Sequence, residues 1–476
     1  MQNRTRDAGR SPSTVAVVGM GKIGLPLAVQ YAQHGRRVIG CDINPVVADM
    51  INTGQSHVQE EPELTAAVAT TVAGGALSAT LDTSEAVCQA AVVVVIVPVV
   101  IDVNHEIDFQ ALDAATSAIG EGLQPGTLII YETTLPVGTT SSRLRRLLER
   151  ASHLQAGRDF HLAYSPERVS SGSIFRDLRN YPKVVGGIDE QSTAAAVEFY
   201  RSVLEADIIT MASTDEAEFV KLIETTYRDV NIALANEYAR FADAHGLDVA
   251  AAIGAANTQP YSHIHSPGVG VGGHCIPVYP YFLLAGVEEP LSHERLSELP
   301  MLTLPRSARR INDAMAEYAV HCIEDILGTL AQQSVLTLGI AYRSDVHEAA
   351  FTSAKLLQDA LREHGATVYA DDPLFSAGEL LALGYTPLAP EQESEIQAII
   401  VQAGHRIYQE YDFARFPVCR VVLDGRRALD RERIEACGIR YITIGDGRTR
   451  GKIRKYEQWV EELAAAKQAI RQGSEK

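Results

Sequence analysis

A glycine-rich turn near the start of the chain constrains the fold more than any other feature of the sequence. An apolar run opens into Gly19-x-Gly21-x-x-Gly24, a helical segment follows at once, and a second apolar run ends at Asp42. Glycines between a strand and a helix let a pyrophosphate approach the helix N-terminus, and an acidic residue roughly 20 positions later binds the ribose hydroxyls of an adenosine. The pattern predicts a dinucleotide-binding βαβ unit, and a purely structural turn is the alternative.

Asp42 also bears on which dinucleotide binds. Its carboxylate repels the 2′-phosphate of NADP, so the sequence favours NAD as the cofactor. Lys22 and Ile23 lie inside the turn. We expect both to contribute to cofactor binding together with the three glycines.

Further apolar runs alternate with helical segments, which predicts an α/β fold with a mostly parallel, doubly wound sheet. These runs cover residues 91–97, 127–132, 160–165, 183–187 and 206–211. Ligand-binding residues belong at the carboxyl ends of such strands, where Pro98, Thr133, Thr134, Glu167 and Arg168 stand. The hydroxyl and carboxylate groups suit hydrogen bonds to cofactor or water, and ordinary strand termination is the alternative.

A long amphipathic helix is predicted between a capping box at Ser213-x-x-Glu216 and a stop at Gly246. At 1.5 Å per residue it spans about 45 Å, so we expect it to join two domains and to form a dimer through its apolar stripe. Lys221 and Thr225 lie four residues apart on a flank of the stripe. A solvated surface lysine is the alternative for Lys221. The stripe consists of Val220, Ile223, Tyr227, Val230, Leu234 and Phe241.

A second glycine-rich segment carries the thiol of Cys275 and the glycines at positions 268, 270, 272 and 273. These glycines allow positive φ and let a ligand approach the backbone. A cysteine behind such a loop is a candidate nucleophile. A tight turn with a buried, inert thiol is the alternative.

A second α/β pattern follows a predicted helix at 303–328. Its expected strands cover residues 334–341, 367–370, 396–401, 418–423 and 440–444. Their ends carry Tyr342, Arg343 and Arg426 among other polar residues. Arginines at sheet ends are good bidentate partners for phosphate, although they are also common on surfaces. The fold class expected is therefore two Rossmann-like domains joined by a long central helix and a small helical dimerisation region.

Composition narrows the class further. The 476 residues carry a net charge of −18, which speaks against a nucleic-acid partner and for a soluble cytoplasmic protein. Six scattered cysteines show neither disulfide nor metal-ligand spacing, and no apolar run reaches the length that a membrane span needs. The expected divisions are a disordered arm (1–12), a cofactor domain (13–212), a central helical domain with the cysteine loop (213–328), a substrate domain (329–450) and a C-terminal helix or tail (451–476).

Taken together, these stretches resemble the UDP-glucose/GDP-mannose dehydrogenase family from about Val15 to Gly445. The form His274-Cys-Ile-Pro277 resembles the branch that oxidises UDP-N-acetylhexosamines. The matching stretches are VAVVGMGKIGLPLA (15–28), DIN (42–44), ETTLPVGTT (132–140), SPERV (165–169), KLIETTYRDVNIALANE (221–237), PGVGVGGHCIP (267–277), LGIAYR (338–343) and DGRR (424–427).

The resemblance implies a homodimer, with a higher oligomer left open, and an NAD-dependent, four-electron oxidation of a UDP-sugar alcohol at C6 to a carboxylate. Cys275 would form a thiohemiacetal and then a thioester, and Lys221 would stabilise the oxyanion. Glu167, assisted by Thr134, would orient or deprotonate the hydrolytic water. Substrate contacts are expected from Arg168, Thr225, Asn231, the loop glycines at 270, 272 and 273, Tyr342, Arg343 and Arg426.

Four positions depart from the family pattern: Tyr279, Thr225, Tyr261 with His263 nearby, and Ala350. A phenol at 279 is no general base at neutral pH. Three functions therefore stay open: the full 6-dehydrogenase, an oxidoreductase that takes another sugar or stops at the aldehyde, and a non-catalytic protein that binds NAD and a UDP-sugar.

Overall fold

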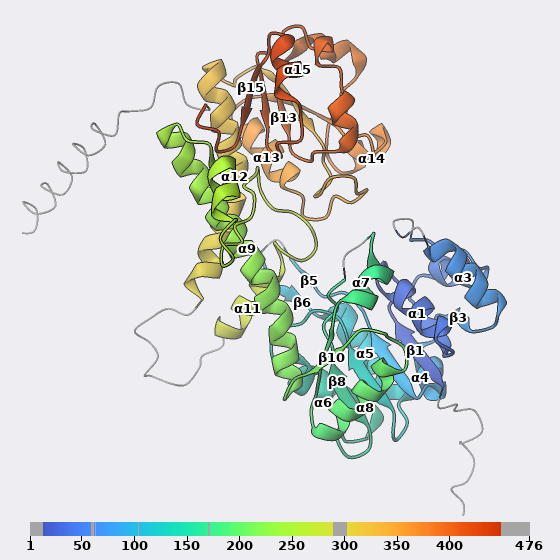
Figure 1. Cartoon of the computed structure of the whole chain (residues 1–476). Coiled ribbons are helices and arrows are strands. Elements are labelled where there is room, and N and C mark those ends of the chain that lie inside the picture. The colour runs from blue at the N-terminus through green and yellow to red at the C-terminus, as the bar shows by residue number, and fades with distance from the viewer. Residues whose placement is uncertain are drawn as a thin grey trace, which may run out of the picture. The chain divides into compact units, whose positions relative to one another are not determined.

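The computed structural model describes residues 13–58, 61, 63–102, 104–169, 172–288 and 302–448. Two compact units share the chain (Figure 1). The first contains the described residues up to Thr225 and the segment from Tyr281 to Glu288, and the second contains residues 226–280 and the chain from helix α12 onward. The expected arm and tail lie outside the described residues. The expected division into a cofactor domain, a central helical domain and a substrate domain stays a prediction.

The first unit is built on an eight-stranded sheet in the order β10-β9-β8-β7-β4-β1-β2-β3. All neighbouring strands pair in parallel except β8 and β9, so the expectation of a mostly parallel sheet is confirmed. Chain order reverses between β1 and β4, which is where such folds bind ligands. The strands are β1 (Thr14–Val18), β2 (Arg37–Cys41), β3 (Leu77–Thr80), β4 (Val92–Val95), β7 (Leu128–Tyr131), β8 (His161–Tyr164), β9 (Lys183–Gly187) and β10 (Ile208–Thr210).

Helices cover this sheet, and as a consequence its central strands are buried on both faces. All five residues of β1 are buried, as the continuous apolar run Thr14–Val18 predicts for a parallel strand. The helical elements are α1 (Gly24–Gln33), α2 (Pro45–Asn52), α3 (Leu64–Ala73), α4 (Thr83–Gln89), α5 (Gln110–Gly122), the π-helical η1 (Thr139–Leu144), α6 (Arg145–Ser152), α7 (Ile174–Asn180) and α8 (Glu190–Arg201). Strand β3 and the short hairpin of β5 (Val100–Ile101) and β6 (Ile107–Asp108) were not expected from the sequence.

Helix α9 (Thr214–His245) continues from the first unit into the second and is the longest helix of the described chain. Ser213 accepts a hydrogen bond from the Glu216 N–H at 3.1 Å, and the Glu216 carboxylate accepts one from the Ala212 N–H at 2.9 Å. Gly246 has a φ of +69° just beyond the last turn. The glycine stop and the Ser213 cap form as the sequence predicts, whereas the Glu216 carboxylate binds the N–H one residue before the position that a capping box requires.

The second unit holds a five-stranded, fully parallel sheet in the order β12-β11-β13-β14-β15. Its order reverses between β11 and β13, which gives it a topological switch point of its own, the position at which such sheets bind ligands. The elements are α10 (Val249–Ala256), α12 (Thr303–Leu327), β11 (Ser334–Leu338), α13 (Ser353–Glu363), β12 (Thr367–Asp371), α14 (Ala377–Ala382), η2 (Pro390–Glu395), β13 (Ile396–Val401), η3 (Arg406–Glu410), η4 (Phe413–Arg415), β14 (Val421–Asp424), α15 (Arg431–Ala436) and β15 (Arg440–Thr443).

Each unit therefore contains one Rossmann-like sheet, and the long helix α9 runs from the first unit into the second, which confirms the expected fold class. Helix α11 (Tyr279–Glu288) begins directly after the cysteine loop. Among the residues that the structure describes, no helix combines the length and the apolar character that crossing a membrane requires.

Candidate functional site

The first glycine turn has the shape of a dinucleotide cradle. Gly19 has a φ of +95°, and a Cβ there would lie 2.7 Å from the Ile96 carbonyl oxygen. A Cβ on Gly24 would overlap the carbonyl oxygen of Gly19, so this glycine allows the helix to pack closely on the strand. Gly21, in contrast, meets no atom within 4 Å. The open space beside Gly21 is where a pyrophosphate would approach the backbone.

Asp42 lies at the end of β2 with its carboxylate beside this turn. One carboxylate oxygen accepts a hydrogen bond from the Met20 N–H at 3.0 Å, and the other accepts one from the Asn44 N–H at 2.9 Å. Ile43, the next residue, exposes 95% of its surface. A fixed carboxylate beside an exposed aliphatic side chain fits the ribose and the base of an adenosine, respectively.

The other expected cofactor residues lie on the same unit. Lys22 and Pro98 are exposed, and Ile23 is the residue before α1. The Thr133 hydroxyl donates to the Val97 carbonyl at 2.7 Å, which ties the end of β7 to the end of β4. Thr134 is buried directly after it. These neighbouring strand ends flank the switch point beside β1, where a nicotinamide would bind.

A buried ionic cluster lies close to the predicted catalytic carboxylate. The Lys183 ammonium donates to Glu132 at 2.7 Å and to Glu167 at 3.0 Å. The hydroxyls of Tyr31 and Tyr200 also donate to Glu132, at 3.2 and 2.6 Å. The side chains of Glu132 and Lys183 are buried, whereas Glu167 keeps 12% of its side chain exposed. Glu167 is therefore the member of the cluster that solvent can reach.

The pKa values of the two carboxyl groups in this cluster shift in opposite directions. Burial raises the pKa of Glu132, and the nearby Glu167 charge adds to this, while Lys183 opposes it. Burial would also raise the pKa of Glu167, but the Lys183 charge and hydrogen bonds, including one from the Arg168 N–H, outweigh it and lower the pKa. One ammonium cannot neutralise two carboxylates, so the proton that is retained belongs to the fully buried Glu132.

Lys221 is brought to Glu167, as the catalytic prediction requires of these two residues. Its ammonium donates to the Glu167 main-chain carbonyl at 2.6 Å, and its side chain is buried. The Thr225 hydroxyl, one turn further along α9, donates back to the Lys221 carbonyl at 2.9 Å. Arg168 pairs with Glu224 at 2.5 Å and also donates to the Pro182 carbonyl. A small hollow lined by Pro166, Glu167, Arg168, Tyr181, Pro182 and Lys183 adjoins this cluster.

The cysteine loop belongs to the second unit, where it packs against the segment after β11. Gly270 and Gly273 have positive φ values of +131° and +101°, whereas Gly268 and Gly272 are required by close contacts. A Cβ on Gly272 would lie 2.9 Å from the Phe351 carbonyl oxygen. The Gly273 N–H donates to the Ala350 carbonyl at 2.9 Å. The loop is therefore held by its backbone.

Cys275 itself is a free, half-buried cysteine. Its carbonyl accepts hydrogen bonds from the N–H groups of Val278 and Tyr279, so the thiol stands at the entry to α11. Cys275 is therefore not the fully buried thiol of the alternative, and its role as a nucleophile stays a prediction. Its convergence with Glu167 and Lys221 on one substrate carbon stays a prediction.

Arg426 ties the glycine loop to the carboxyl end of the second sheet. Its guanidinium donates to the carbonyls of Gln402 at 2.6 Å and Gly270 at 3.2 Å. Burial lowers the pKa of Arg426 to about 10, so it remains charged at neutral pH. A half-buried cation whose hydrogen bonds go to carbonyls suits a phosphate ligand.

The remaining substrate candidates surround the same loop or lie along α9. The Tyr342 ring packs against Gly273, and the exposed Arg343 lies 6.0 Å from the centroid of that ring. The Asn231 side chain donates to the His263 carbonyl at 2.6 Å and accepts from the His265 N–H at 2.9 Å. Asn231 therefore fixes the segment 263–265, and its contact with a substrate stays a prediction.

Several residues of these sites were not singled out from the sequence. Lys183 begins a strand, and Tyr31 and Tyr200 lie within helices, so nothing in their local patterns indicates a shared carboxylate. His405, buried after β13, pairs with Asp372 at 3.1 Å and accepts from the Asp345 N–H. Asp372 in turn accepts from the N–H groups that precede Tyr342. The polar strand ends Asp371-Asp372-Pro373 and Gly404-His405-Arg406 were the sequence signals for this network.

The first sheet and its glycine turn define the class as a dinucleotide-binding α/β protein, and the second unit adds another Rossmann-like sheet. Models of the UDP-glucose/GDP-mannose dehydrogenase family match the chain in two places, the NAD-binding domain over residues 13–204 and the central domain over residues 215–313.

Named relatives extend these matches. The UDP-N-acetyl-D-mannosamine dehydrogenase of Pyrococcus horikoshii is 36% identical over 75% of this chain and 83% of its own. The NDP-N-acetyl-D-galactosaminuronic acid dehydrogenase of Ralstonia nicotianae is 32% identical over 89% of this chain and 98% of its own. A solved structure of the Pyrococcus horikoshii UDP-D-ManNAc dehydrogenase aligns with a TM-score of 0.81 at 32% identity, covering 91% of this chain and 99% of that one.

The chain belongs to the UDP-glucose/GDP-mannose dehydrogenase family. It is accordingly an NAD-dependent oxidoreductase of the nucleotide-sugar dehydrogenase type.

Proposed function

We propose that this enzyme oxidises the C6 alcohol of a UDP-N-acetylhexosamine to the uronic acid. The observation that carries the proposal is a half-buried thiol, Cys275, on a backbone-held glycine loop in a chain that aligns over 91% of its length with a UDP-D-ManNAc dehydrogenase. A protein that only bound NAD and a UDP-sugar would have no use for a thiol, a buried lysine and a partly exposed carboxylate together.

The cofactor supplies a hydride acceptor for each of the two oxidations. Gly19, Gly21, Gly24 and Asp42 would hold the adenosine and pyrophosphate portion. Lys221, whose ammonium is held at the Glu167 carbonyl, would stabilise negative charge on the sugar C6 oxygen.

The thiolate of Cys275 would add to the C6 aldehyde to give a thiohemiacetal, which becomes a thioester after the second oxidation. Hydrolysis then needs a water molecule near Glu167. Because Lys183 keeps this carboxylate ionised, Glu167 is suited to accept a hydrogen bond from that water, with Thr134 assisting. Release of the acid restores the thiol.

The uridine diphosphate would bind at the switch point of the second sheet. Arg426 and Arg343 supply cations there, and the glycine loop supplies accessible backbone. We also propose a homodimer that forms through helix α9, whose apolar stripe includes Ile223 and Phe241 with 44% and 59% of their surfaces exposed.

The yield of NADH per sugar tests the proposal directly. Purified enzyme is given limiting amounts of UDP-N-acetylmannosamine, UDP-N-acetylglucosamine, their galacto isomer and UDP-glucose. We expect two NADH per N-acetylhexosamine. One NADH would instead favour an enzyme that stops at the aldehyde, and none with every sugar would leave only the binding function.

The variant Cys275→Ser separates the two oxidations. We expect it to lose acid formation by at least about 100-fold, because an alcohol is a far weaker nucleophile than a thiolate. Binding of NADH, followed by fluorescence, should be unchanged. The exposed thiol Cys437 provides a matched control as Cys437→Ser. Undiminished acid formation by Cys275→Ser would refute the thioester route.

A further inference from the structure

One face of helix α12 carries a set of metal-ligating side chains that the proposed reaction does not use. Glu317, His321 and Glu324 are spaced four and three residues apart, so they share this face. His364 joins them from the residue that follows α13. All four residues belong to the second unit.

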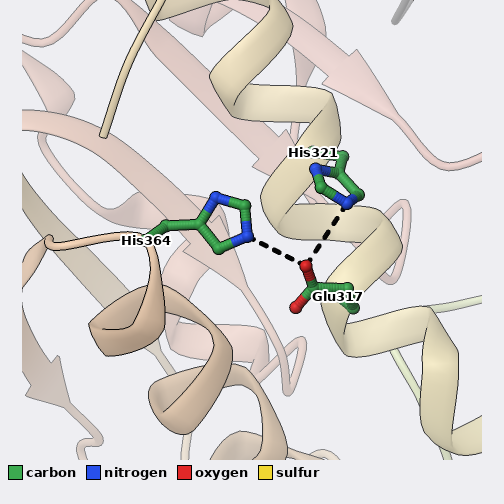
Figure 2. A group of neighbouring side chains, drawn as sticks. All are labelled: Glu317, His321 and His364. Carbon is green, nitrogen blue, oxygen red and sulfur yellow. Dashed lines mark hydrogen bonds and ion pairs between the residues drawn. The ribbon is translucent and has the colours of Figure 1, made fainter. Parts of the chain in front are cut away.

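Both imidazoles direct the same nitrogen at one carboxylate oxygen. His364 Nε2 lies 2.9 Å and His321 Nε2 lies 3.3 Å from Glu317 Oε1 (Figure 2). The ligand atoms of these three residues all lie within 4.8 Å of one another. Two ligand atoms of a tetrahedral zinc site lie about 3.4 Å apart, because each is about 2.1 Å from the ion. The three donors therefore need only small shifts to share one ion.

The opposite nitrogens of both rings face a second carboxylate. Glu324 Oε2 lies 3.1 Å from His364 Nδ1 and 3.6 Å from His321 Nδ1. The two rings are inclined at 75° to each other, with centroids 5.1 Å apart. A carboxylate on the far nitrogen is the usual way in which a protein orients a metal-bound histidine.

We propose that Glu317, His321 and His364 bind a divalent transition-metal ion of the zinc type through Glu317 Oε1 and the two Nε2 atoms. Glu324 is a positioning residue that orients both rings. Two imidazoles and a carboxylate suit Zn²⁺, Co²⁺ or Ni²⁺ rather than Mg²⁺ or Ca²⁺, which prefer oxygen donors. The ion would clamp α12 to the end of α13.

This site was outside the sequence-based expectation, which held no metal. In the sequence, only the spacing of the cysteines was considered as evidence for a metal site. His364 follows α13, far along the chain from the two ligands on α12, so their spacing does not indicate a shared site. The proposal is independent of the dehydrogenase reaction, because none of its four residues has a role in that reaction.

Zinc binding to the full-length, chelator-treated protein tests the proposal. Zn²⁺ is titrated by calorimetry, and Co²⁺ is added in parallel so that its visible spectrum reports the ligands. We expect one high-affinity Zn²⁺ per chain. His321→Ala should lower the affinity at least about 100-fold, and Glu324→Gln should lower it about tenfold by releasing the rings.

His347→Ala is the matched control, since His347 also pairs with one glutamate, Glu379 at 3.2 Å, but belongs to no metal-ligating group among the described residues. This variant should keep the wild-type affinity. His321 is half-exposed on a helix surface, so its replacement leaves the fold intact, and circular dichroism verifies this.

Three outcomes would overturn the proposal. They are the absence of stoichiometric Zn²⁺ binding at micromolar concentrations, equal affinity in His321→Ala, and a near-ultraviolet thiolate-to-Co²⁺ band. The last would show that the ion is held by a cysteine.

Discussion

At the scale of single residues, the cluster around Lys183 shows how two carboxyl groups beside one cation come to differ in protonation state. Glu132 receives two tyrosine hydroxyls and the ammonium in a fully buried position, whereas Glu167 keeps some contact with solvent. Burial holds a proton on the first, and the Lys183 charge keeps the second ionised. The cluster thus keeps Glu167 anionic, and the main-chain carbonyl of the same residue binds the Lys221 ammonium.

The raised pKa of Glu132 makes a prediction about stability against pH. The native state keeps a proton that the unfolded chain releases above its ordinary pKa of about 4.3. The stabilisation is therefore fully present below that value and is lost as pH rises through the raised pKa. Glu132→Gln removes this loss, so its free energy of unfolding should fall less between about pH 5 and pH 8 than that of the wild type.

Urea unfolding at several pH values measures this difference. The exposed Glu205 provides the control as Glu205→Gln, which should follow the wild-type curve. If the Glu132→Gln and wild-type curves run parallel, Glu132 does not hold the extra proton.

At the scale of elements, each parallel sheet brings separate strand ends and a glycine loop together. In the first unit the glycines of the nucleotide turn have distinct tasks, since Gly24 allows helix packing and Gly21 faces open space. In the second unit the loop that precedes Cys275 is pinned by Arg426 and by the segment after β11. Loops held in this way keep the backbone of a binding site rigid.

The two glycines give a matched pair of variants. Gly24→Ala should lower the free energy of unfolding by about 1–3 kcal/mol, because its methyl group would overlap the Gly19 carbonyl. Gly21→Ala should unfold at nearly the wild-type temperature yet bind NADH at least about tenfold more weakly. Thermal unfolding and NADH fluorescence distinguish these effects. Equal NADH affinity in Gly21→Ala and wild type would argue against the cradle.

At the scale of the whole molecule, helix α9 presents apolar side chains to solvent. Phe219, Ile223, Tyr227, Leu234, Tyr238 and Phe241 are each at least 39% exposed, and they follow one another at spacings of 4, 4, 7, 4 and 3 residues. Soluble chains rarely leave so long an apolar stripe uncovered. A second copy of the same helix is the partner that we propose.

This dimer makes a prediction about assembly. Phe241→Glu should shift the protein from dimer to monomer in sedimentation at micromolar concentration, because a buried, unpaired charge is costly in an interface. Leu381→Glu is the control, since Leu381 is 62% exposed on another helix. A wild-type protein that sediments as a monomer would contradict the proposal.

Much of this molecule could be read from local patterns. The continuous apolar runs predicted buried parallel strands, and the glycine turn predicted the cofactor cradle, since both depend on neighbouring residues only. The same holds for the ends of α9, where the Ser213 cap and Gly246 each act within one turn. Short strands such as β3 were missed, because Leu77–Thr80 is only half apolar and pairs only at the sheet edge.

Contacts between distant residues were decided by the tertiary structure. The sequence placed Glu167 and Lys221 in one reaction only through a resemblance, whereas the fold puts the Lys221 ammonium on the Glu167 carbonyl. Neither the contact of Lys183 with Glu132 nor that of His364 with the residues of α12 gave a sequence signal, because the partners lie on different elements. Local patterns record which backbone shape a segment prefers, but the chemistry of a buried charge depends on which partners the packing of whole elements brings to it.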